Sequence, residues 1–80
     1  MADVKETVVK VVADTTSKSV EEVAAAADAS YIDELGMTSI EIFPIISELE
    51  DQLDVEIDFA AFLSQATSVN ATVAFIEALA

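Results

Sequence analysis

The most informative stretch of this chain is DELGMTSIE, residues 33–41. It contains Gly36, the single glycine of the protein, and glycine readily adopts the positive φ angles that tight turns require. Thr38 and Glu41 follow with the spacing of a capping box. In that motif the threonine oxygen accepts a hydrogen bond from the third helical N–H, and the glutamate accepts one from the threonine N–H. The stretch therefore predicts a turn that leads into a helix.

The helix expected after this turn runs from Ser39 to Leu53. Its large aliphatic residues recur at helical spacing within about 100° of arc, as on the buried face of an amphipathic helix. This buried face would consist of Ile42, Ile45, Ile46, Leu49 and Leu53. The opposite, solvent-facing side would carry Ile40, Pro44, Ser47, Glu48 and Asp51, with Glu41 and Asp54 at its edges and Phe43 on one flank.

Two features of this helix need separate explanations. Pro44 removes one backbone hydrogen bond from the helix interior, which predicts either a bend or a loosely formed first turn. Ser39 stands at the positive end of the helix, where free N–H groups favour an anionic ester such as a phosphate. Ser39 is either a plain cap residue or the site of such an ester.

Around this stretch the chain resembles the acyl carrier proteins. The resemblance rests on LGMTSIE at residues 35–41, on the helix that follows, and on DVEI at residues 54–57. It extends upstream to VEEV at residues 20–23 and downstream to TSV at residues 67–69. In that family a serine within an Asp-Ser-Leu motif carries 4′-phosphopantetheine, which implies that Ser39 is the attachment residue. This chain has Thr38-Ser39-Ile40 in place of Asp-Ser-Leu.

The charge is strongly one-sided. The formal net charge is −13, and residues 19–80 contain thirteen acidic residues and no basic one. Such a surface repels nucleic acid and anionic lipid, and it attracts basic patches on proteins. The alternative is a solvated surface that only keeps a small protein soluble. We expect no nucleic-acid partner.

The composition also excludes several chemistries. The chain has no histidine and no cysteine, which excludes a serine–histidine triad, a cysteine nucleophile and an ordinary zinc site. Residues 28–33 lack the spacing of a calcium-binding loop. We therefore expect neither an enzyme nor a metal site. The first residues lack the layout of a signal peptide, and no apolar run approaches the ~18 residues of a membrane span. These features predict a cytoplasmic protein with no membrane insertion.

The rest of the chain completes an all-α prediction. Residues 3–14 form an amphipathic helix with a valine stripe at positions 4, 8, 11 and 12. Residues 19–30 form a loop with one short helical turn, and Val23, Tyr31 and Ile32 anchor it to the core. Asp58 caps a short helix through Leu63, residues 64–68 form a loop, and Thr67 or Ser68 caps a last helix with Val69, Val73, Ile76 and Ala80 along one face. We predict a single domain, residues 1–80, folded as a small bundle of three main helices plus one short helix.

The resemblance implies a carrier function. A phosphopantetheinyl transferase would move 4′-phosphopantetheine from coenzyme A onto Ser39, and the thiol of the arm would hold acyl intermediates as thioesters. A monomeric carrier would deliver them to acyl-transferring or acyl-modifying enzymes with basic docking patches, in fatty acid, polyketide or related lipid biosynthesis. A bundle core of Ile, Val and Ala could part to shelter a short acyl chain. The partner-binding residues would be Ile40, Glu41, Phe43, Glu48 and Asp51. The alternative is an unmodified acidic protein-interaction module that retains the fold.

Overall fold

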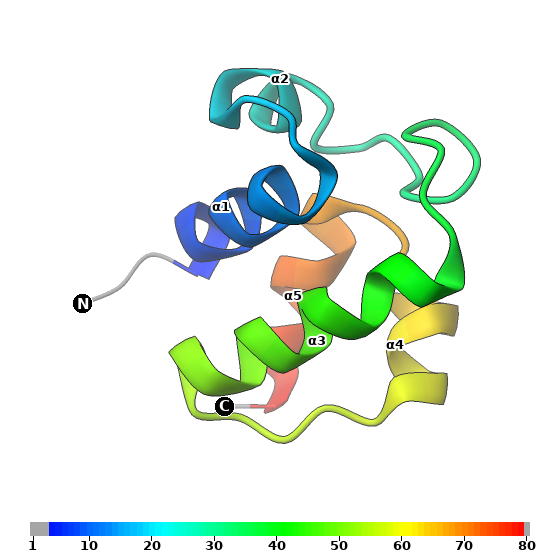
Figure 1. Ribbon diagram of the computed structural model, residues 1–80. Helices are drawn as coiled ribbons and strands as arrows, with labels where there is room; N and C mark the ends of the chain where they lie inside the picture. The colour runs from blue at the N-terminus through cyan, green and yellow to red at the C-terminus, as the bar shows by residue number, and fades with distance from the viewer. Residues whose placement is uncertain (1–3, 80) are drawn as a thin grey trace.

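The structure is a computed structural model that describes residues 4–79, and within them the chain forms helices and no strand. In chain order these are α1 (Val4–Thr16), α2 (Val20–Ala25), α3 (Ser39–Leu53), α4 (Phe59–Gln65) and α5 (Val69–Leu79). The centre of the bundle is α1, which packs against α2, α3 and α5, while α4 packs against α3 and α5 (Figure 1). The predicted all-α bundle of three main helices and a short one is confirmed, and α2 is the short helical turn expected between residues 19 and 30.

The first helix is buried on more than one face. Val8, Val11 and Val12 are buried as predicted, and Val9 and Ala13 are buried with them, because α1 has neighbours on several sides. The helix ends two residues later than predicted. Ser17 takes a left-handed conformation with φ 58°, and the Lys18 N–H donates to the Ala13 carbonyl oxygen at 3.0 Å. This is the usual way in which a helix closes its last turn.

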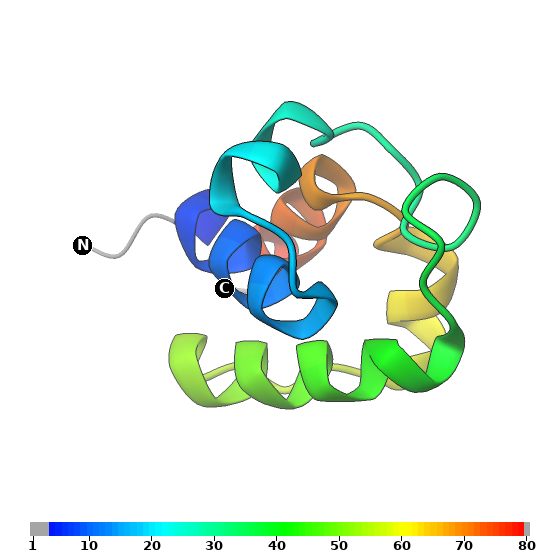
Figure 2. The same ribbon diagram turned by 45° about the horizontal axis from the view of Figure 1, so that its top comes forward.

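The segment between α2 and α3 is a long loop that is tied to the start of α5. The Asn70 N–H donates to the Ala27 carbonyl oxygen, and the Tyr31 N–H donates to the Thr67 carbonyl oxygen, each at 2.9 Å. Figure 2 shows this loop reaching from α2 past the start of α5 to α3. These bonds place residues 26–37 firmly, although most of them are not helical.

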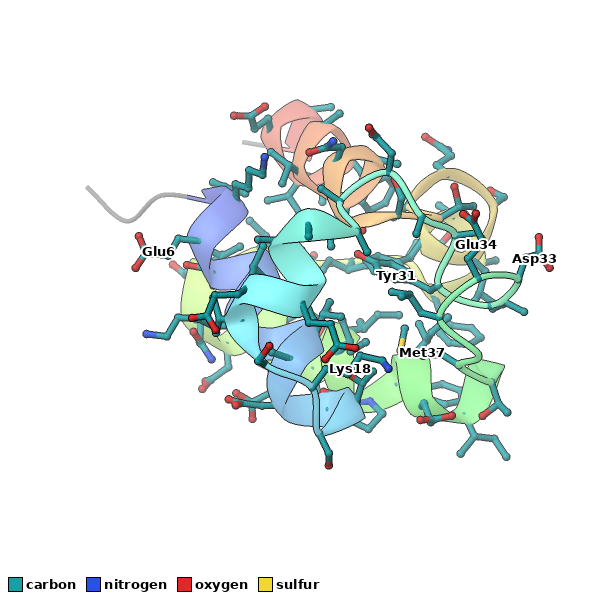
Figure 3. The ribbon with its side chains drawn as sticks, turned by 90° about the horizontal axis from the view of Figure 1, so that it is seen from above. Glu6, Lys18, Tyr31, Asp33, Glu34 and Met37 are labelled. Carbon is teal, nitrogen blue, oxygen red and sulfur yellow. The ribbon has the colours of Figure 1, made fainter. Side chains whose placement is uncertain are left out.

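One of the three predicted anchors of this loop is wrong. Val23 and Tyr31 are buried, but Ile32 is 48% exposed. Residues 31–34 form a turn, so neighbouring side chains diverge, with Tyr31 directed inward and Asp33 outward (Figure 3). Met37, which is 3% exposed, provides the apolar contact that was expected of Ile32. Its N–H donates to the Tyr31 carbonyl oxygen at 2.9 Å.

A polar pair lies inside the core. The Tyr31 hydroxyl and Thr72 Oγ1 are 2.6 Å apart, and both side chains are buried. Thr72 Oγ1 also donates to the Ser68 carbonyl oxygen at 2.7 Å. Since a hydroxyl has one proton, Tyr31 must be the donor to Thr72. Burial raises the pKa of Tyr31 to about 12.

The third helix has the predicted bounds and buried face. Ile42, Ile45, Ile46 and Leu49 are buried, and Leu53 is partly buried against them. The expected disturbance at Pro44 is absent: the helix begins regularly at Ser39, and Figure 2 shows it continuing past Pro44 without a sharp kink. Ile40 and Pro44 both lie on the exposed face. The Ile40 carbonyl that lacks an N–H partner therefore faces water, which can bond to it.

The last two helices are capped by side chains. Asp58 accepts a hydrogen bond from the Ala61 N–H at 3.3 Å, and Ser68 accepts one from the Ala71 N–H at 3.1 Å. The fourth helix continues to Gln65, so the predicted loop over residues 64–68 is too long. Ser64 fits inside this helix because its hydroxyl donates to the Ala61 carbonyl oxygen at 3.1 Å.

The predicted apolar face of the last helix is present in large part. Val69 and Ile76 are buried, and Val73 is partly buried against the core. Thr72 is also on this buried side, because its hydroxyl has partners there. Ala80, the fourth predicted member of the face, lies outside the described residues.

The buried hydroxyl of Tyr31 should make the fold sensitive to alkali. Its pKa is raised from 10.0 to about 12 in the folded state, so the folded chain holds this proton more tightly than the unfolded chain. The stabilisation is complete below about pH 10 and is lost as the pH rises through about 12. Because the chain has one tyrosine and no tryptophan, tyrosinate absorbance will report this titration directly.

The control variant Tyr31→Phe should lack the part of the alkaline destabilisation that comes from ionisation of Tyr31. Thermal unfolding at increasing pH measures this difference. The variant should also be about 1 kcal/mol less stable at neutral pH, because one buried hydrogen bond is lost. A Tyr31 that titrates near pH 10 in the folded protein would contradict the buried pair.

Candidate functional site

The turn before α3 is built by a few local hydrogen bonds and one special backbone angle. Gly36 has a φ of +72°, as the sequence predicts, and a Cβ at this position would meet nothing within 4 Å. The backbone angle, rather than lack of space, therefore favours glycine here. Upstream, the Ser30 carbonyl oxygen accepts from the Glu34 and Leu35 N–H groups at 3.0 Å each, and Glu34 Oε2 accepts from the Ser30 N–H at 2.8 Å.

The start of α3 is fixed by Thr38 and Glu41, the predicted capping box. Glu41 Oε1 accepts from the Thr38 N–H at 3.0 Å, and the Thr38 hydroxyl lies 3.4 Å from the same oxygen. The Glu41 N–H donates to the Thr38 carbonyl oxygen at 3.1 Å. Ser39 is then the first residue of α3, at the end where a helix carries free N–H groups and partial positive charge.

The outer face of α3 carries the remaining predicted site residues. Ile40 is 75% exposed and Phe43 is 53% exposed, while Glu48 and Asp51 are also exposed. Ile40, Pro44, Ser47 and Asp51 share this face by helical geometry, as expected. Glu41 and Phe43 lie on its two opposite flanks. Glu41 is only partly exposed because its carboxylate is committed to the cap.

Each flank of α3 faces a different neighbour. On the side of α1, Glu48 and Gln52 join Asp14 and Thr15 in lining an open groove of about 330 Å³. Gln52 Nε2 donates to Glu48 Oε2 at 3.1 Å in this region. On the side of α4, the Phe43 ring stacks on the Phe59 ring. At 100° per residue, the docking residues proposed from the sequence are therefore spread over about 160° of the helix, a little less than half of its circumference.

Phe59 is a residue beside this face that the sequence analysis did not single out. It is partly buried against the core, and its ring lies parallel to that of Phe43 with centroids 4.1 Å apart and planes 1° apart. Its position directly after the cap residue Asp58 is the available signal. A side chain in the first turn of a short helix lies near the helix end, where a neighbouring helix can reach it.

The enclosed space beside α3 is small. Beside α3, a cavity of about 30 Å³ lies between the loop and α4, and Tyr31, Ile42 and Leu63 are among the residues that line it. This volume is about that of one water molecule. Among the described residues, no three His, Cys, Asp or Glu side chains are grouped as metal ligands would be. Within residues 4–79, no helix is both long and apolar enough to cross a membrane.

Comparison with known proteins gives one family. The model of the family described as "Phosphopantetheine attachment site" matches residues 6–76. This range contains α2, α3 and α4 and nearly all of α1 and α5, so the match covers the fold as a whole. No solved structure matches the chain.

The geometry of the cap predicts different effects for two acidic residues of α3. Glu41→Ala removes the acceptor of the Thr38 N–H, whereas Glu48→Ala removes an exposed charge of the same sign. We expect Glu41→Ala to cost about 1 kcal/mol more than Glu48→Ala, as is typical for the loss of a helix cap. Thermal unfolding of the two variants should then differ by about 4–8 °C for a domain of this size. Equal melting temperatures would show that the cap contributes nothing.

Proposed function

The chain belongs to the phosphopantetheine attachment site family, and from this membership we propose that Ser39 is the residue that carries the arm. The matched domain is the attachment site of a covalently bound 4′-phosphopantetheine group, which supports a carrier role for this chain. The proposal for Ser39 is supported chiefly by its place as the first residue of α3, directly after the turn at Gly36 and inside the matched range.

The residues around Ser39 fit such a group. Thr38 and Ile40, its two neighbours, are exposed. The free N–H groups at the start of α3 favour a phosphodiester there. The capping box holds the backbone of this segment at the start of the helix. When attached, the arm supplies the thiol that the chain itself lacks.

Carriers of this family interact with a phosphopantetheinyl transferase and with acyl-handling enzymes. We propose that these partners have basic docking patches and meet the outer face of α3, with Ile40, Phe43, Glu48 and Asp51 as contacts. Glu41 borders this face, and its bond to the Thr38 N–H limits it to an edge contact. The charge supports the proposal, since residues 19–80 contain no base to offset thirteen acids.

We further propose that residues 1–80 act as one monomeric, non-catalytic carrier domain of fatty acid, polyketide or related lipid biosynthesis. The small cavity beside Tyr31 and Ile42, about 30 Å³, bears on how cargo is held. Even a short acyl chain would enter the core only if the loop or α4 moved away from α3. Such movement would have to break the Tyr31–Thr72 hydrogen bond or loosen the contacts of Leu63.

An unmodified interaction module remains the second candidate. It is favoured by Thr38, which replaces the aspartate of the resembled motif, and by Pro44 within α3. Both candidates use the same acidic face, so attachment of the arm distinguishes them.

Loading of Ser39 can be tested by mass. Incubation with coenzyme A and a transferase of broad specificity should add the mass of one phosphopantetheine group, and Ser39→Ala should abolish the gain. Ser47→Ala is the matched control, because Ser47 is an exposed serine on the same helix and should load normally. Absence of any mass gain with several transferases would favour the unmodified module.

Two variants of the outer face should affect different steps of docking. Glu48→Lys should slow association with a basic transferase and flatten its salt dependence, because exposed charges mainly steer encounters. Ile40→Ala should speed dissociation about 5- to 30-fold, since it removes roughly 1–2 kcal/mol of apolar burial. The association and dissociation rate constants can be measured by surface plasmon resonance. If both variants bind as the parent protein does, the docking surface lies elsewhere.

A further inference from the structure

Phe43 and Phe59 form an aromatic pair at the surface where α3 meets α4. Their rings are parallel, with centroids 4.1 Å apart. Phe43 is 53% exposed, and Phe59 is partly buried beneath it. One face of the Phe43 ring is thus covered by Phe59, and the exposure of the residue is left to its other face and its edge.

Fixing α4 in place does not account for this pair. The fourth helix is already held by Phe62, which is completely buried and meets Phe75 edge to face at 5.8 Å. Leu63 adds a partly buried contact with the core. An additional contact made only for packing would gain most from full burial, whereas about half of Phe43 remains in water.

The surroundings of the pair are acidic. Helical spacing places Glu50 on the same flank of α3 as Phe43, about 10 Å further along the helix, and Asp58 directly precedes Phe59 in the chain. Glu50 accepts the Ile57 N–H at 2.9 Å, which holds the link between α3 and α4 against this flank. With no lysine or arginine in residues 19–80, this part of the surface favours a cationic occupant.

An aromatic face beside carboxylates distinguishes between the two basic side chains. The guanidinium of arginine is planar and weakly hydrated, so it stacks on an aromatic ring while its N–H groups reach neighbouring carboxylates. The ammonium of lysine is compact and strongly hydrated, and it gains less from a flat apolar ring. We propose that the open face of Phe43, backed by Phe59, is a stacking site for an arginine side chain of a partner protein.

The proposal deepens the docking role proposed for the outer face of α3, and it makes that role selective for arginine. It does not depend on the modification of Ser39. It can therefore be tested on the unmodified chain, and a failure to load Ser39 would leave it untouched.

The test compares two probe peptides of equal length and charge, one of alternating serine and arginine and one of alternating serine and lysine. Dissociation constants are measured at low ionic strength from the NMR shifts of the phenylalanine ring protons. We expect the arginine peptide to bind about two- to five-fold more tightly, the range expected for a cation over an exposed ring. The Phe43 ring protons should show the largest shifts.

Two variants test whether the preference for arginine arises at the Phe43 ring. Phe43→Leu keeps an apolar side chain and removes the ring, so its two dissociation constants should become equal. Leu79→Ala removes an exposed apolar residue of α5 that belongs neither to the pair nor to the proposed docking face, and it should keep the preference for arginine. Equal binding of both peptides to the parent chain, or a preference that survives in Phe43→Leu, would overturn the proposal. The comparison on the parent chain needs no variant and stands even if Phe43→Leu folds poorly.

Discussion

Tyr31 joins the loop before α3 to the start of α5, which is distant in sequence, and to the residues just before α3. Its N–H bonds to the Thr67 carbonyl oxygen, its carbonyl oxygen bonds to the Met37 N–H, and its hydroxyl bonds to Thr72. The first and third bonds fix the loop to the start of α5, and the second fixes the residues just before α3. The start of α3 is therefore positioned from inside the core, although it lies at the surface. The segment proposed to carry the arm is thereby tethered to the core.

The acidic residues both destabilise the fold by mutual repulsion and stabilise it through local hydrogen bonds. Thirteen acids in residues 19–80 repel one another in the compact state,. Several of them also have structural partners: Glu41 and Asp58 cap helices, Glu34 and Glu50 accept backbone N–H groups, and Glu22 pairs with Lys18 at 3.8 Å. The acids of α3 without such a structural role, among them Asp51, are the ones that fit the docking proposed for this helix.

Local signals account for most of what the sequence predicted correctly. The bounds of α3 follow from Thr38, Glu41 and the spacing of its isoleucines, because caps and periodicity act within a few residues. Predictions that depended on tertiary contacts were less successful. The choice between Ile32 and Met37 as a core residue depends on how the turn over residues 31–34 meets the core. The length of α4 was missed for a local reason, since the Ser64 hydroxyl bonds back to the Ala61 carbonyl oxygen. The stacking of Phe43 on Phe59 joins two helices and has no local pattern at all.

Pro44 has a consequence for how α3 moves. Since it donates no hydrogen bond to Ile40, the first turn of α3 is joined to the rest of the helix by one bond fewer than an ordinary helix would have. Local opening of that turn therefore breaks fewer bonds than opening at any turn further along, and its free energy is correspondingly lower. In amide hydrogen exchange the residues around Ser39 would form a separate, less protected unit at the end of a well-protected helix. The segment proposed to receive the arm is thus both anchored by its neighbours and able to yield without unfolding the bundle.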